Sequence, residues 1–98
     1  MVNAFIMTRL VVDPDKVDGA LDLFREMSED VAANEPGTVD YRFLRDDRQP
    51  EVFWCWQVYA DEAARTEHLG RHGHRAPQFA AVLAEPAAMS LLSEADLG

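Results

Sequence analysis

The chain has 98 residues, a length that allows one folded domain and little more. A hydrophobic share of 48 % and a charged share of 28 % are ordinary for a globular protein and exclude a disordered chain. Nine Lys and Arg against eighteen Asp and Glu leave a net charge of −9, which excludes nucleic acids and anionic membranes as favoured partners, because the protein would repel their phosphates.

Targeting and redox signals are absent from the sequence. No apolar run approaches the ~20 residues that span a bilayer, and residues 1–5 lack the basic and apolar stretches of an export signal. The single cysteine, Cys55, can form neither an internal disulfide nor a paired-cysteine zinc site. We therefore expect a cytoplasmic protein that does not associate with membranes.

The first half of the chain predicts strand, helix, strand. Residues 2–12 are almost continuously apolar and end at Asp13-Pro14, a pair that stops a strand and starts a helix. The helix extends to Asn34, before Pro36 and Gly37. Its apolar residues recur every three or four positions, at Val17, Ala20, Leu21, Phe24, Met27 and Val31. Residues 38–45 alternate between apolar and polar, which predicts a half-buried edge strand.

The second half predicts a strand over 52–59, which forms a hairpin with 38–45, and then a helix over 62–69 capped by Asp61. Gly70 and Gly73 predict a break, after which Pro77 restarts a helix that Pro86 ends. Residues 87–92 predict a last short strand, and the polar tail 93–98 is expected to fray.

This order of elements is the β-α-β-β-α-β pattern of the ferredoxin-like fold. We therefore predict an α+β protein with a four-stranded antiparallel sheet and its helices on one face. A single domain covers residues 1–98, with an ordered core over about 2–92.

The strand over 52–59 is apolar on both faces, with Trp54 and Trp56 on one side and Phe53 and Cys55 on the other. Two helices of the predicted length cover only one face of such a sheet. The uncovered face would leave large aromatic side chains in water, which is typical of an interface. We therefore predict a homodimer in which sheet packs on sheet, with Trp54 and Trp56 at the contact.

Several local features resemble the antibiotic biosynthesis monooxygenase family. They are the Glu35-Pro36-Gly37 turn followed by Tyr41, the hairpin, and the stretch from Tyr59 through Ala64 to His68-Leu69. The resemblance extends over about residues 2–92. It implies a dimeric α+β barrel with a substrate cavity between sheet and helices in each subunit. It also implies oxidation of a phenolic, quinol or anthrone-like small aromatic molecule by O₂, with no cofactor.

Compared position by position, the sequence departs from parts of the family pattern. Tyr59 occupies the place of a frequent Trp, and Cys55 the place of an Asn that anthrone oxygenases carry. Haem-degrading relatives have an Asn on the first strand and a haem-ligating His on the last helix, where this sequence has Thr8 and Phe79, so the resemblance argues against haem. His68 matches a histidine that is common in the family.

His68 is the predicted general base, since an imidazole pKa near 6.5 suits proton transfer at neutral pH, and the Tyr59 hydroxyl is the predicted hydrogen-bond donor to an oxyanion. The other residues expected to line a pocket are mostly apolar: Thr8, Phe24, Phe53, Cys55 and Phe79. Because Gly70 and Gly73 interrupt the helix and no fixed carboxylate completes a set, we predict no metal site at His68, His72 and His74.

Two other functions agree with the same residues. A dimer of this kind could be a non-catalytic small-ligand-binding protein or a stress-associated protein that uses the same pocket. A proton-transfer enzyme, such as an isomerase of a small carbonyl compound, would need only His68 and Tyr59.

Overall fold

The computed structural model describes residues 3–98; Val2, where the first strand was predicted to begin, lies outside them. The elements in chain order are β1 (Ala4–Val11), α1 (Val17–Asn34), β2 (Thr38–Arg45), β3 (Val52–Tyr59), α2 (Glu62–His72), α3 (Ala76–Val82) and β4 (Ala88–Ser93). Short 3₁₀ turns at Pro14–Lys16 and Gly73–Arg75 precede α1 and α3. The predicted ferredoxin-like α+β fold is confirmed, with the helix after β3 divided into α2 and α3.

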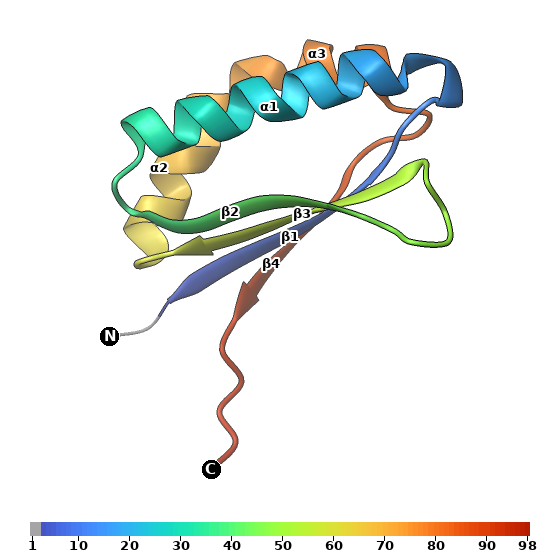
Figure 1. Ribbon diagram of the computed structural model, residues 1–98. Coiled ribbons are helices and arrows are strands. Elements are labelled where there is room, and N and C mark those ends of the chain that lie inside the picture. The colour runs from blue at the N-terminus through green and yellow to red at the C-terminus, as the bar shows by residue number, and fades with distance from the viewer. Residues whose placement is uncertain (1–2) are drawn as a thin grey trace.

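The four strands form one antiparallel sheet in the order β2-β3-β1-β4. The two strands that are apolar on both faces, β1 and β3, lie at its centre, and the alternating β2 lies at an edge, as predicted. Figure 1 shows α1, α2 and α3 on one side of this sheet, and the C-terminal residues after β4 leading away from the domain. Within residues 3–98, no helix combines the length and the apolar character that crossing a membrane requires.

Side-chain caps begin α2 and the 3₁₀ turn before α1, whereas α1 itself begins at Val17, three residues after the predicted start at Pro14. The Asp13 carboxylate accepts the backbone N–H of Asp15 at 2.9 Å, ahead of the turn that leads into α1. The Asp61 carboxylate accepts the backbone N–H of Ala64 at 2.8 Å in the first turn of α2. Each bond satisfies one of the N–H groups that a helix start leaves without an intrahelical partner.

The predicted end of the second helix at Leu69 is wrong. Helix α2 continues through Gly70 to His72. A glycine inside a helix costs roughly 1 kcal/mol, a penalty that tertiary contacts readily overcome. Arg71 and His72, in the last turn, both contact Glu35 after the end of α1. This extra turn places His68 and His72 on the same side of the helix, one turn apart.

The main hydrophobic core lies between the sheet and α1, where Leu10, Phe24, Met27 and Phe53 are buried. On the opposite face of the sheet, Trp54 and Trp56 pair with β1 and remain half-buried in the single chain. Leu44 on β2 and Leu92 on β4, on the same face, are 46 % and 42 % exposed. The helices therefore leave a broad apolar sheet face open.

Candidate functional site

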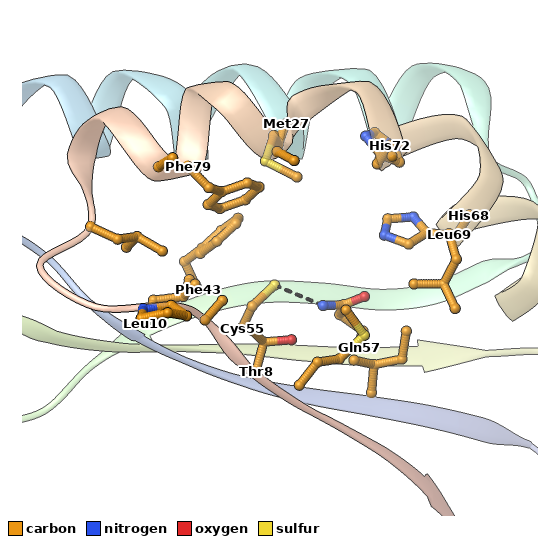
Figure 2. A pocket seen from close by; sticks show the side chains of 18 of the residues that line it. Thr8, Leu10, Met27, Phe43, Cys55, Gln57, His68, Leu69, His72 and Phe79 are labelled. Atoms are coloured by element: carbon orange, nitrogen blue, oxygen red, sulfur yellow. Dashed lines mark hydrogen bonds between the residues drawn. The ribbon is translucent and has the colours of Figure 1, made fainter.

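A cavity of about 640 Å³ lies between the sheet and helices α2 and α3. Thr8 of β1 and Cys55 and Gln57 of β3 point into it from the sheet. Figure 2 shows His68 and Gln57 at one end and Phe79 at the other. Its lining is mostly apolar, with a small number of polar side chains, among them Gln57 and His68 at one end, which is the usual composition of a small-molecule site.

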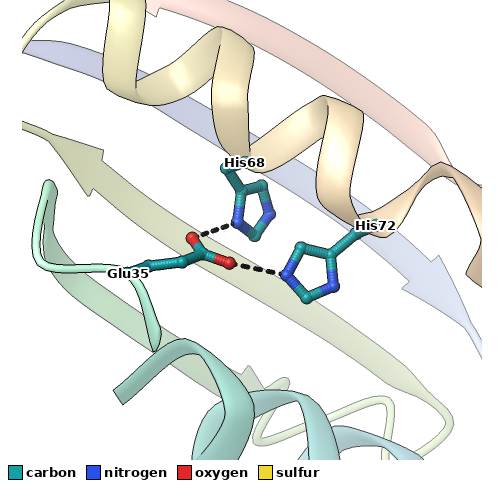
Figure 3. Close-up of side chains that lie close together, drawn as sticks. All are labelled: Glu35, His68 and His72. Carbon is teal, nitrogen blue, oxygen red and sulfur yellow. Dashed lines mark hydrogen bonds and ion pairs between the residues drawn. The ribbon is translucent and has the colours of Figure 1, made fainter. Parts of the chain in front are cut away.

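Glu35 forms hydrogen bonds with both histidines of α2, His68 and His72 (Figure 3). Its Oε1 lies 2.7 Å from His68 Nδ1, and its Oε2 lies 2.6 Å from His72 Nε2. Thr38 donates to Oε1 at 2.8 Å, and Arg71 donates to Oε2 at 2.5 Å. Only 6 % of the Glu35 side chain is exposed. A carboxylate this well supplied with donors stays ionised despite its burial.

The proton positions on His72 follow from its two neighbours. Its Nε2 faces the Glu35 carboxylate, which only accepts hydrogen bonds. Its Nδ1 lies 3.1 Å from Arg75 Nε, a group that only donates. These two contacts place a proton on Nε2 and the lone pair on Nδ1. Arg75, itself buried, also contacts Glu26 on α1 and so ties the start of α3 to that helix.

His68 has one nitrogen fixed and one free. Its Nδ1–H donates to Glu35, which leaves the lone pair on Nε2. Nε2 has no hydrogen-bond partner among residues 3–98, yet in that part of the chain every buried side-chain nitrogen and oxygen has one. The Nε2 atom is therefore accessible. His68 lines the cavity and also a small hollow beside Glu35 and Thr38, and Figure 2 shows its ring turned toward the cavity. This arrangement directs a basic nitrogen at whatever occupies the cavity.

Burial and hydrogen bonding set the charges of this group. Burial lowers the pKa of His68 from its ordinary 6.5, and the bond to Glu35 opposes that effect only in part. Burial by itself would raise the pKa of Glu35 from 4.5, but the hydrogen bonds from His68, His72 and Thr38 outweigh it and lower the pKa. At pH 7 the pair is thus an anionic carboxylate beside a neutral imidazole, which is ready to accept a proton.

These shifts predict that the protein loses stability in acid. Because folding lowers the pKa of His68, the unfolded state binds more protons below about pH 6.5, and the free energy of unfolding falls as the pH decreases from there. The lowered pKa values of Glu35 and Asp30 extend the loss below about pH 4.5. Urea denaturation between pH 4 and 8 measures this directly, and a midpoint that rises as the pH falls from 7 to 5.5 would contradict it.

The oxygen of Glu35 and the nitrogens of His68 and His72 lie within 4.8 Å of one another, a donor set that a divalent transition metal could use. The surroundings do not fit that use. A histidine bound to metal through Nε2 carries its proton on Nδ1, where Arg75 already donates. The Arg71 guanidinium also lies directly on the carboxylate. The expectation that no fixed carboxylate accompanies these histidines is wrong, because Glu35 does. That carboxylate accepts hydrogen bonds from His68, His72 and Arg71 and is not arranged to bind a metal.

The structure brings together four of the seven predicted site residues around the cavity: Thr8, Cys55, His68 and Phe79. Tyr59 does not line the cavity. It is fully buried, its ring lies 5.2 Å from that of His68, and its hydroxyl donates to Gln57 Oε1 at 2.5 Å. Burial raises the pKa of the Cys55 thiol to about 12, so the cavity wall carries a neutral thiol there.

Phe24 and Phe53, also expected in the pocket, belong to the core behind it. Phe24 stacks on Phe43 with ring centroids 4.3 Å apart and meets Phe53 edge to face at 5.4 Å. The Phe24→Ala variant should lose about 3–5 kcal/mol of unfolding free energy, because it leaves a cavity in a packed aromatic cluster. Phe79→Ala, at the half-buried pocket wall, should lose less. Equal losses in urea denaturation would contradict this assignment.

Sequence reasoning did not find Glu35, His72 and Gln57 as site residues. The i, i+4 spacing of His68 and His72 indicates two histidines on one face of a helix. The predicted helix break at Gly70 argued against that arrangement, but α2 continues to His72. Gln57 shares the strand parity of Cys55 and Tyr59, which places it on the helix-covered face. Nothing local in the sequence indicates that Glu35 would meet α2.

Comparison with known proteins agrees with this architecture. The family model for antibiotic biosynthesis monooxygenases matches residues 4–82. Similar solved structures include a Caulobacter crescentus protein, with TM-score 0.87, 22 % identity and 97 % of this chain and 92 % of that one covered. Rv0793 of Mycobacterium tuberculosis has TM-score 0.85 and 20 % identity, with 96 % of each chain covered. A Nitrosomonas europaea protein of unknown function has TM-score 0.76 and 25 % identity, with 100 % of this chain and 96 % of that one covered. No curated protein matches the chain.

Proposed function

Because the chain belongs to the antibiotic biosynthesis monooxygenase family, whose fold is monooxygenase-like or small-ligand-binding, we propose that it oxidises a phenolic, quinol or anthrone-like molecule with O₂. The observation that carries the proposal is the free Nε2 of His68 at a largely apolar cavity, with the opposite nitrogen held by the buried Glu35 carboxylate. That pair provides a base for an acidic substrate O–H or C–H group, and such help is worth about 10²–10⁴-fold.

In the proposed reaction His68 Nε2 takes a proton from the substrate, and the resulting anion transfers one electron to O₂. Superoxide and the substrate radical combine at a carbon that carries hydrogen, which forms a C–O bond. The His68 imidazolium returns its proton to the peroxide. The O–O bond then breaks as that carbon loses its hydrogen, and one oxygen atom leaves as water while the other remains as a carbonyl. The substrate anion supplies the electrons, so the reaction requires no resident cofactor.

A second candidate function is supported by the same pair of residues. The Glu35–His68 arrangement can move a proton next to a carbonyl group without O₂, as an isomerase does. This candidate and the oxygenase differ in their co-reactant, which makes them separable by experiment.

Oxygen uptake with a panel of hydroquinones and anthrones tests the proposal. We expect saturable uptake of one O₂ for each carbonyl formed, with one ¹⁸O atom from ¹⁸O₂ in the product. Saturable binding of every panel member without uptake would overturn the oxygenase and favour a ligand-binding protein. Solvent deuterium exchange at the α-carbon of a ketone, without O₂ consumption, would overturn it in favour of the isomerase.

We also propose a homodimer in which the open faces of two sheets pack together. The support is the set of apolar side chains on that face, among them Trp54, Trp56, Leu44 and Leu92, which the helices do not cover. Sedimentation equilibrium should give twice the 11.0 kDa chain mass at micromolar concentration. A folded single chain at that concentration would contradict the dimer. It would not bear on the cavity chemistry, because the cavity lies within one chain.

A further inference from the structure

Gln57 is a polar side chain at the reactive end of the cavity. It lies on β3 between Cys55 and Tyr59 and is only 5 % exposed. Figure 2 shows its amide beside the His68 end, across the cavity from Phe79. A buried amide in a mostly apolar wall is costly unless its hydrogen bonds are made, so the partners of Gln57 define what it can do.

Tyr59 fixes the orientation of this amide. The Tyr59 hydroxyl donates to Gln57 Oε1 at 2.5 Å, and burial raises the pKa of Tyr59, so the hydroxyl keeps the proton it donates. With Oε1 held, the NH₂ group faces the other way. One of its N–H groups donates to Cys55 Sγ at 3.3 Å. The second has no protein acceptor among the described residues and remains for a ligand in the cavity.

The charge of the cavity wall makes this donor important. Among residues 3–98, no Lys or Arg lines the cavity, and the one carboxylate that does, Glu85, is paired with Arg9 at 3.1 Å. When His68 removes a proton, its own imidazolium is the cation beside the new anion. The anion then depends on neutral donors of the lining, which include Gln57 and the hydroxyls of Thr8 and Tyr41. In a site of low dielectric constant, a donor that is already oriented is worth more than the same donor in water.

We propose that Gln57 donates the hydrogen bond that stabilises the substrate oxyanion, and that Tyr59 is a positioning residue that holds Gln57 in that orientation. This inference rests on the proposed function for the origin of the anion. It deepens that function by defining the ligand as a neutral aromatic molecule whose ionisable oxygen lies at the Gln57 and His68 end. Molecules that already carry a carboxylate or phosphate are disfavoured, because the described lining residues include no Lys or Arg.

The test uses 4-nitrophenol, whose phenol and phenolate forms have different absorption spectra, so it needs no turnover. The apparent pKa of the dye is measured with the protein in saturating excess. We expect wild-type protein to lower this pKa relative to free dye. Gln57→Met should raise the bound pKa by roughly one to two units, a tenfold to hundredfold loss of phenolate stabilisation, because a hydrogen bond to a charged group is lost.

Tyr59→Phe should raise the pKa of the bound dye by a smaller amount, since the amide is present but free to rotate. Gln49→Leu removes an exposed glutamine side chain in the β2–β3 turn and should leave the wild-type value unchanged. If Gln57→Met folds poorly because the buried Tyr59 hydroxyl loses its acceptor, the double variant with Tyr59→Phe removes both partners and should show the full loss.

The inference would be overturned if the pKa of the bound dye were the same in wild type and Gln57→Met. It would also be overturned if the dye did not bind to the wild-type protein. Either result is distinct from a failure of the oxygenase proposal. Protein without oxygen uptake can still lower the dye pKa through Gln57, and an active oxygenase can fail this titration. With an active substrate, Gln57→Met should lower kcat more than it raises KM, because the anion exists only after proton transfer.

Discussion

His68→Ala should lower kcat/KM for the oxidation by about 10²–10⁴-fold, the usual contribution of a positioned general base. The variant removes the accessible Nε2 but leaves Glu35 with hydrogen bonds from Thr38, Arg71 and His72, so the fold should persist. The rate of oxygen uptake measures the first effect, and circular dichroism the second. Added imidazole should restore part of the rate, because it can enter the space that the side chain leaves.

His74→Ala is the matched control, since His74 is exposed in the turn before α3 and does not line the cavity. Its oxygen uptake should equal that of wild type. A normal rate in folded His68→Ala would remove His68 from the mechanism. The loss of rate should be accompanied by loss of the acid limb of the pH–rate profile, because that limb reports protonation of the base.

Glu35→Gln should be the most destabilising substitution at the site, with a loss of about 3–5 kcal/mol of unfolding free energy. Arg71 and the two imidazole N–H groups would then face a neutral amide, which can accept at one oxygen only. Urea denaturation measures the loss. Glu29→Gln makes the same chemical change at an exposed position on α1 and should change stability little.

The same Glu35→Gln variant has a kinetic signature that a purely structural role would not produce. The carboxylate stabilises the protonated form of His68, so its removal should lower the pKa of His68 and shift the acid limb of the pH–rate profile to lower pH. An acid limb that remains in place would show that Glu35 does not act through His68.

Local signals in the sequence predicted most of the fold. The Asp61 start of α2 was confirmed, and Asp13-Pro14 begins a 3₁₀ turn that leads into α1 at Val17. Both signals are local, because a capping side chain bonds to backbone only two or three residues away. The central position of β1 and β3 followed from their apolar residues on both faces of the strand. Exposing either face to water is unfavourable, so such strands belong inside the sheet whichever strands lie beside them. The predicted end of α2 was wrong because a glycine costs a helix little stability. The contacts of Arg71 and His72 with Glu35, which the sequence does not reveal, outweigh that cost.

For the site, the sequence by itself determined which residue types were available: His68 as the proposed base, and Thr8, Cys55 and Phe79 on the faces of elements that enclose a cavity. Only the tertiary structure decided how they are used. Glu35 lies 33 residues before His68 in the chain, and it meets α2 because the end of α1 and the last turns of α2 pack over the same sheet. Hydrogen bonds between segments so far apart depend on packing and not on sequence spacing, so the tautomer of His68 and the orientation of Gln57 had to come from the folded chain.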